Sequence, residues 1–248
     1  MIQSRRSIGL YASCLVACAA MVVAQTKPAD TKPPRKPEDA ITPFKRKEFP
    51  EKHADFLARG KQGPVDLLFI GDSITDFWPR RGELTWLKFA DLHPADFGIS
   101  GDRTEHVLWR LTTGGELDNV KPKVVVVMIG TNNIGHFDSE KPEWAAAGVT
   151  KIVETIREKL PEAKVLLLGV FPRDTKDHPR RKAVTEINAI LAKLDDGEHV
   201  WFRDVGNVFL DDQGELPADV MADKLHPGPK GYELWYAAIR PTIDQLMK

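Results

Sequence analysis

Residues 65–74 read VDLLFIGDSI and carry the strongest indication of the chain's architecture. The run over 65–70 is largely apolar and has the length of a buried strand, which Gly71 ends. Ser73 follows at the carboxyl end of that strand, where ligands gather in an open α/β sheet. A serine there, with its backbone N–H free at the start of the next helix, is placed to be a nucleophile. The alternative is a serine that only caps a helix.

A histidine near the carboxyl end of the chain changes the balance between these interpretations. In the turn DKLHPG, over residues 223–228, Asp223 precedes His226 by three positions. This spacing lets Asp223 accept a hydrogen bond from one ring nitrogen of His226 and leaves the other nitrogen to act as a base. Taken alone, an exposed loop histidine beside a capping aspartate is the simpler interpretation. The serine and this pair together are more specific than either alone.

Two further segments carry groups that an acyl-transfer site needs. Residues 97–102, FGISGD, follow a predicted strand and supply two glycines whose backbone N–H groups can face a ligand. Residues 124–129, VVVVMI, are the clearest strand in the chain, and GTNN follows at 130–133. An asparagine at a strand's carboxyl end can donate its side-chain N–H to an oxyanion, although an Asx turn is a frequent alternative.

Strands and helices alternate along the rest of the chain. This alternation predicts an α/β fold, in which a parallel sheet has helices on both of its faces. The pattern predicts strands near residues 65–70, 94–98, 123–129, 164–170 and 199–204. It predicts helices near residues 45–60, 74–90 in pieces, 104–111, 143–160, 178–195 and 229–247.

The order GDS, FGISGD, GTNN and DKLH resembles the four sequence blocks of the SGNH or GDSL hydrolases, which are serine esterases and lipases. The similarity is closest to the branch that contains the catalytic subunits of intracellular platelet-activating-factor acetylhydrolase. Residues 106–111 (HVLWRL) and 115–117 (GEL) resemble that branch outside the catalytic blocks. The resemblance covers about residues 45–247 and implies a flavodoxin-like three-layer α/β/α sandwich, with a five-stranded parallel sheet in the order 2-1-3-4-5.

The resemblance also implies a role for each residue of the site. Ser73 would be the nucleophile, His226 the general base and acid, and Asp223 the residue that orients His226. The oxyanion hole would consist of the Ser73 and Gly101 backbone N–H groups and the Asn132 side chain. No metal and no cofactor is expected for this chemistry.

Three more residues are candidates for the pocket. Ser100 stands where the acetylhydrolase branch tends to have a glycine, which can change the space beside the acyl group. Asp72, next to the nucleophile, is either a second carboxylate of the site or, as we prefer, a structural residue that bonds the neighbouring loop. His136 is either at the pocket rim or a surface histidine.

The amino terminus predicts export. Basic residues precede an apolar run within residues 1–24, and this pattern is typical of a signal peptide cleaved after Ala24. Two alternatives remain open, a lipid anchor at Cys18 in the lipobox-like LVAC and a single membrane anchor. The only other cysteine, Cys14, lies in the same segment, so the mature chain would have no disulfide.

Residues 25–43 are rich in Pro and Lys, which predicts a disordered linker before a single hydrolase domain over 44–248. The net charge is −1, and removal of residues 1–24 takes away Arg5 and Arg6 and no acidic residue, which makes it −3. Neither charge indicates a nucleic-acid partner.

These observations predict a periplasmic or secreted serine esterase that cleaves short-acyl, acetyl in particular, esters of a carbohydrate or lipid. The substrate can be a small molecule or a polysaccharide, and the oligomeric state is left open. Two other functions compete with this one. The first is a metal-dependent phosphoesterase with Asp72, Asn132, Asp223 and His226 as ligands, and the second is an inactive module that binds envelope polysaccharide.

Overall fold

A central parallel sheet organises residues 33–248, the part of the chain that this computed structural model describes. Its five strands follow the order β2-β1-β3-β4-β5, and every neighbouring pair is parallel. The predicted strand order is therefore confirmed. The strands are β1 (Leu67–Gly71), β2 (Pro94–Gly98), β3 (Val124–Met128), β4 (Lys164–Leu168) and β5 (Val200–Arg203).

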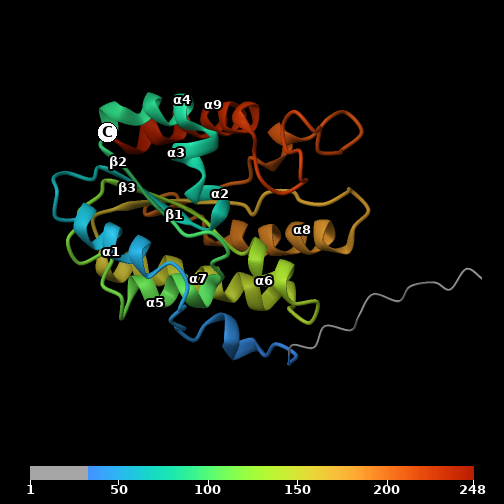
Figure 1. The fold of residues 1–248 in the computed structure, drawn as a ribbon, viewed down its shortest axis with the longest axis horizontal. Coiled ribbons are helices and arrows are strands. Elements are labelled where there is room, and N and C mark those ends of the chain that lie inside the picture. The colour runs from blue at the N-terminus through green and yellow to red at the C-terminus, as the bar shows by residue number, and fades with distance from the viewer. Residues whose placement is uncertain (1–32) are drawn as a thin grey trace, which may run out of the picture. The chain divides into compact units, whose positions relative to one another are not determined.

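Helices cover both faces of the sheet, which confirms the three-layer sandwich (Figure 1). One face carries α1 (Pro50–Arg59), α5 (Thr104–Leu111), α7 (Pro142–Lys159) and α8 (Pro179–Leu191). The other carries α3 (Trp78–Arg81), α4 (Glu83–Trp86), η2 (Leu87–Leu92) and α9 (Pro229–Leu246). Shorter elements are η1 (Pro37–Ala40), α2 (Ser73–Asp76), α6 (Thr131–His136), η3 (Ala192–Leu194) and η4 (Gly206–Phe209).

The central strands are apolar throughout because both of their faces are buried. In β1, Leu68 and Ile70 join the hydrophobic cluster under α5 and α7, while Leu67 and Phe69 join the cluster under α9. Successive side chains of a strand point to opposite faces, so one run of four apolar residues supplies both layers. Full burial of each such side chain contributes about 1.5–3 kcal/mol, which fixes the position of the strand end that follows.

The first helix is shorter than the predicted 45–60. It begins at Pro50, because Phe49 adopts a left-handed conformation with φ 58° that cannot continue a helix. Proline is well suited to the first turn, where its missing N–H costs no hydrogen bond. The preceding residues 41–49 therefore run as an irregular segment along the domain.

The disordered linker expected over 25–43 differs from the structure at its described end, residues 33–43. Ala40 is fully buried, and its carbonyl accepts a hydrogen bond from Thr104 Oγ1 at 2.8 Å. Arg35 forms ion pairs with Glu105 at 2.9 Å and with Glu140 at 2.8 Å. The composition predicts disorder because this segment has few large apolar residues. In the structure, buried ion pairs hold the segment against the domain.

The predicted signal peptide, with Cys14 and Cys18, lies outside the described residues, as do residues 25–32. Within residues 33–248, no helix is long and apolar enough to cross a membrane.

Candidate active site

Three strands end at the same edge of the sheet and bring their following loops together. Gly71 at the end of β1 pairs with Gly98 of β2 and with Met128 of β3. A Cβ on Gly71 would lie 2.1 Å from Thr75 Oγ1, and one on Gly98 would lie 2.2 Å from the Asp76 nitrogen. These two glycines therefore let α2 pack directly on the strand ends.

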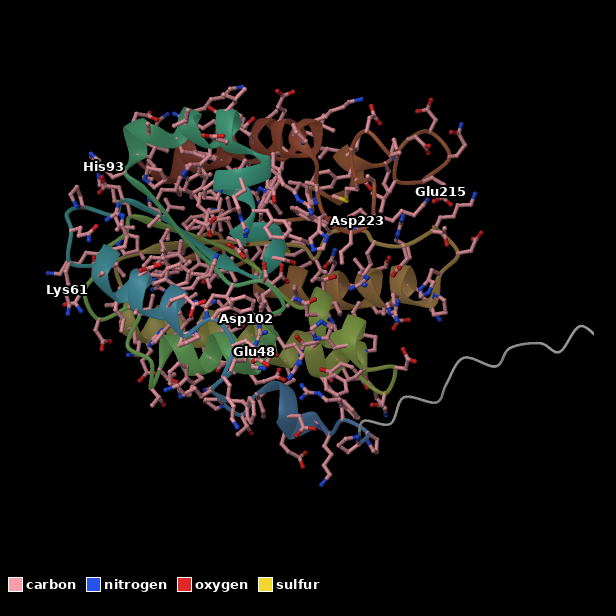
Figure 2. The ribbon with its side chains drawn as sticks, in the orientation of Figure 1. Glu48, Lys61, His93, Asp102, Glu215 and Asp223 are labelled. Carbon is pink, nitrogen blue, oxygen red and sulfur yellow. The ribbon has the colours of Figure 1, made fainter. Side chains whose placement is uncertain are left out.

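Ser73, His226 and Asp223 form a continuous hydrogen-bonded chain at this edge. Ser73, the first residue of α2, has its Oγ 2.9 Å from His226 Nε2. His226 Nδ1 lies 2.7 Å from Asp223 Oδ2, and the His226 backbone N–H donates to Asp223 Oδ1 at 2.7 Å. Figure 2 shows Asp223 on the loop that precedes α9. The arrangement allows His226 to take a proton from Ser73 while Asp223 fixes the orientation of the ring.

The loop that carries Asp223 and His226 is held by its backbone. Lys224 has a left-handed φ of 55°, and its carbonyl accepts a hydrogen bond from the Asp174 N–H at 2.8 Å. Partial burial disfavours the Asp223 carboxylate, but hydrogen bonds from His226 and Leu225 outweigh it and hold its pKa below the ordinary value. Asp223 is therefore ionised at neutral pH and able to stabilise a positive charge on His226.

Candidate donors to a developing negative charge lie on the segments that follow the neighbouring strands β1, β2 and β3. As the first residue of α2, Ser73 has a backbone N–H without an intrahelical partner. Gly101 adopts a left-handed φ of 80°, which favours glycine. The buried Asn132 side chain donates to the Asp102 carbonyl at 2.9 Å and keeps a second amide hydrogen for another acceptor.

Asn133 has a different role from its neighbour. Its Oδ1 accepts from the Thr104 N–H at 3.1 Å, and its Nδ2 donates to Thr104 Oγ1 at 3.0 Å and to Glu140 Oε1 at 3.2 Å. The side chain is fully buried. Asn133 therefore joins α6 to the start of α5.

Asp72 is a buried structural residue rather than part of an open pocket. It is fully buried, and its Oδ1 accepts the Ile74 N–H at 3.0 Å, which caps α2. Its Oδ2 has no hydrogen-bond partner among the described residues. Burial, helped by the negative charge of Asp102, raises the pKa of Asp72 to about 7. The Asp72 carboxylate therefore bonds the first turn of its own helix, whereas the sequence interpretation that we preferred placed its bond to the neighbouring loop.

The other two pocket candidates are engaged with charged side chains. Ser100 donates to Asp76 Oδ2 from its backbone N–H at 3.2 Å and from its Oγ at 2.5 Å. Ser100 therefore ties its loop to α2. His136, at the end of α6, has its Nδ1 3.3 Å from Arg103 Nη1.

A buried ion network beneath the site was missed from the sequence. Arg110 is 4% exposed and donates to Asp102 Oδ2 at 2.9 Å, to Glu116 Oε2 at 2.5 Å and to the Phe97 carbonyl at 3.1 Å. Its signal was an arginine inside the otherwise apolar part of HVLWRL. Such a residue is buried only when its charge is paired.

Among residues 33–248, no group of three or more His, Cys, Asp or Glu side chains is arranged to hold a metal ion. The phosphoesterase alternative requires Asp223 and His226 as metal ligands. In the structure these two side chains form a hydrogen bond with each other.

Residues 69–234 match the GDSL-like lipase/acylhydrolase family. Human platelet-activating factor acetylhydrolase IB subunit alpha2 is 36% identical over 197 residues, which are 79% of this chain and 83% of that protein. A solved GDSL-like lipase from Bacteroides thetaiotaomicron shares the fold with a TM-score of 0.61 at 20% identity, over 78% of this chain and 97% of that one. An acetylxylan esterase from Geobacillus stearothermophilus does so with a TM-score of 0.56 at 20% identity, over 72% and 94%. The chain therefore belongs to the GDSL-like lipase/acylhydrolase family and is a carboxylic ester hydrolase.

Proposed function

We propose that this esterase works through a covalent acyl-enzyme on Ser73, with His226 as general base and acid and Asp223 as the residue that orients it. The observation that carries the proposal is the 2.9 Å contact between Ser73 Oγ and His226 Nε2, continued by the 2.7 Å contact to Asp223. Both distances are within the range over which protons are transferred between hydrogen-bonded groups.

The steps follow from this geometry. His226 Nε2 takes the proton of Ser73 as Oγ attacks the ester carbonyl carbon. The bond to the alcohol then breaks, and His226 returns the proton to the leaving oxygen. Water next gives a proton to His226 as its oxygen attacks the acyl carbon. The bond from that carbon to Ser73 Oγ then breaks, and His226 returns the proton to Oγ, which restores Ser73 and releases the acid. In both halves the carbonyl oxygen becomes negative, and the Ser73 and Gly101 N–H groups and the Asn132 amide stabilise it.

A fluorophosphonate probe tests the nucleophile. Mass spectrometry should find the label on Ser73 alone, and Ser73→Ala should lose nearly all esterase activity while it stays folded. Ser139→Ala is the matched control, since Ser139 bonds the Arg35 N–H at 2.9 Å in another part of the domain. Full activity in Ser73→Ala would overturn the proposal. If that activity were also lost on addition of a chelator, the metal-dependent phosphoesterase would be favoured.

We propose acetyl or similarly short acyl esters of a carbohydrate or lipid as substrates. Support comes from the relatives, because one is named an acetylhydrolase and a protein of the same fold is named an acetylxylan esterase. Rates on p-nitrophenyl acetate, butyrate and octanoate test the acyl group, and the rate should fall as the chain lengthens. Release of acetate from acetylated xylooligosaccharides and from acetylated glycerophospholipids then separates the two alcohol classes. A rate that rises with chain length would indicate a lipase instead.

We also propose that the enzyme is exported, on the support of the signal-like residues 1–24. The intact mass of the protein recovered from the cell envelope tests this. A chain that begins at Gln25 supports cleavage by signal peptidase, and a lipid-modified chain that begins at Cys18 supports a lipoprotein. A chain that retains residues 1–24 would contradict both.

A further inference from the structure

We propose that Arg46 is a positioning residue that fixes the peptide group between Ser100 and Gly101, and with it the Gly101 N–H of the oxyanion hole. Arg46 lies in the irregular segment before α1. Its Nη1 donates to the Ser100 carbonyl at 2.9 Å and to Asp102 Oδ1 at 3.0 Å, so it spans Gly101 from both sides. The inference rests on the proposed function, since it assumes that the Gly101 N–H receives the negative charge.

One peptide group, between Ser100 and Gly101, connects Arg46 with the proposed oxyanion hole. The Ser100 carbonyl and the Gly101 N–H belong to the same planar trans peptide, so they point in opposite directions. A donor that holds the carbonyl therefore fixes the direction of the N–H on the other side. Gly101, with φ 80°, lacks a Cβ and has few steric restraints of its own, so this peptide could otherwise rotate. Arg46 removes that freedom before the substrate binds.

The same guanidinium also reaches the second proposed donor through Asp102. Asp102 is 1% exposed, and its carbonyl accepts from Asn132 Nδ2 at 2.9 Å. Its carboxylate is shared between Arg46 and Arg110. Of these two arginines, only Arg46 contacts the Ser100 carbonyl, whereas Arg110 donates to the carbonyls of the preceding strands. Arg46 is therefore the cation that acts on the peptide group itself.

The position of Arg46 is itself held on both sides. The Phe44 N–H donates to the Glu105 carbonyl at 2.9 Å, and the Arg46 guanidinium lies 5.5 Å from the centre of the Phe49 ring. The Arg46 side chain is 18% exposed, and Figure 2 labels Glu48 and Asp102, the two carboxylates that it contacts. Arg46 precedes residues 69–234, the part of the chain that matches the family. We call its two hydrogen bonds, to the Ser100 carbonyl and to Asp102 Oδ1, the clamp.

Arg46→Met, Arg46→Lys and Arg46→Ala test the clamp in the full-length enzyme. Arg46→Met should lower kcat about 10- to 100-fold with KM within about twofold, because a misdirected donor weakens binding of the transition state but not of the ester. Arg46→Lys should lose less, since an ammonium can still reach one of the two acceptors. Millimolar methylguanidinium should restore part of the lost kcat in Arg46→Ala. Glu48→Gln is the control, because it removes only the exposed partner of Arg46, 3.4 Å from Nε.

The outcomes separate this inference from the function on which it rests. Fluorophosphonate labelling of Ser73, measured in the same preparations, reports whether the nucleophile is correct. If Ser73 is labelled but Arg46→Met keeps its kcat, the clamp is wrong and the proposed function stands. A loss that appears only in KM, or one that neither lysine nor methylguanidinium reduces, also overturns the clamp. If Arg46→Met fails to fold, the lysine variant and the rescue still decide.

Discussion

The two sides of the site are built in contrasting ways. On the side of the proposed oxyanion donors, Asn132 is 6% exposed and Asp102 only 1%, and both are held by hydrogen bonds or ion pairs. On the opposite side, the His226 side chain is 19% exposed and that of Asp223 is 48% exposed. The Asp223 loop is joined to the rest of the domain by backbone hydrogen bonds such as that from the Asp174 N–H.

The contrast fits the role that we propose for each side. Donors to an oxyanion act best when they are fixed in a place that excludes water, because they then stabilise charge without reorganising. A base that must exchange protons with water in every cycle needs access to solvent. With the roles proposed above, the burial of Asn132 suits the stabilisation of charge, and the exposure of His226 suits proton exchange with water.

The largest effect is expected from removal of His226, the proposed base. His226→Ala should lower kcat/KM on the order of 10⁴-fold or more, as in other serine hydrolases in which the base is removed. Asp223→Ala should lose less, because water can reach the exposed position and partly replace the carboxylate. The double variant should be little worse than His226→Ala. Asp219→Ala is the control, since Asp219 pairs with Lys230 at 2.6 Å in the same region.

Additive losses in that cycle, measured as kcat/KM with all variants folded, would contradict a shared role. If Asp223→Ala were as inactive as His226→Ala, the shared role would stand, but the expected compensation by solvent at the exposed Asp223 would be wrong.

A smaller loss of kcat is expected on the buried side of the site, where Asn132 and Asn133 can be compared. Asn132→Ala should lower kcat about 100-fold or more with KM nearly unchanged, because it removes a donor that acts on the transition state. Asn133→Ala should change kcat far less and instead lower the free energy of unfolding by about 1–3 kcal/mol, because the buried Thr104 N–H loses its acceptor. Steady-state kinetics and urea unfolding measure the two effects.

The two variants control each other, since they differ by one position. A larger loss of kcat in Asn133→Ala, with both proteins folded, would move the proposed oxyanion donor to Asn133.

The last prediction concerns stability and its dependence on pH, through the buried Asp72. Its pKa is about 7 in the folded protein and 3.8 in its unperturbed state, so the folded state holds the proton more strongly. The folded state is therefore favoured at low pH, and this contribution is lost as pH rises from about 4 to 7. Asp72→Asn removes the titration while an oxygen remains to cap α2.

Urea unfolding at several pH values measures this effect. The free energy of unfolding of the natural protein, minus that of Asp72→Asn, should fall on the order of 1 kcal/mol per pH unit between about pH 4 and 7 and stay level above. A difference that rises with pH would mean that the ionised form of Asp72 is stabilised, with Arg173 as the nearby positive charge.

Much of the architecture could be predicted from the sequence because its signals are local. The apolar run VVVVM, residues 124–128, is buried on both faces and lies inside the sheet, as its composition predicts. The alternation of strands and helices, and the family blocks around Ser73 and His226, identified the fold and the enzyme class. Predictions of this kind succeed because periodicity and short motifs depend on neighbours in the chain.

The extent of the ordered domain could not be predicted in this way. Residues 33–43 have the composition of a linker, yet Arg35 pairs with Glu105 and Glu140, which lie far from it in the chain. Charged residues carry no periodic pattern, so their partners appear only when the helices have packed. Helix α1 likewise begins later than the apolar spacing predicted. The left-handed conformation of Phe49 stops the helix before Pro50, and the apolar spacing of the sequence does not reveal that conformation.

The sequence by itself determined the α/β fold, the order of the elements, the family and the residue types available for chemistry. Only the tertiary structure decided which groups the Asn133 side chain bonds, and that an arginine from before α1 reaches the Ser100 carbonyl. The physical reason is that strand and helix patterns arise within about ten residues, whereas hydrogen-bond partners depend on distances across the folded chain.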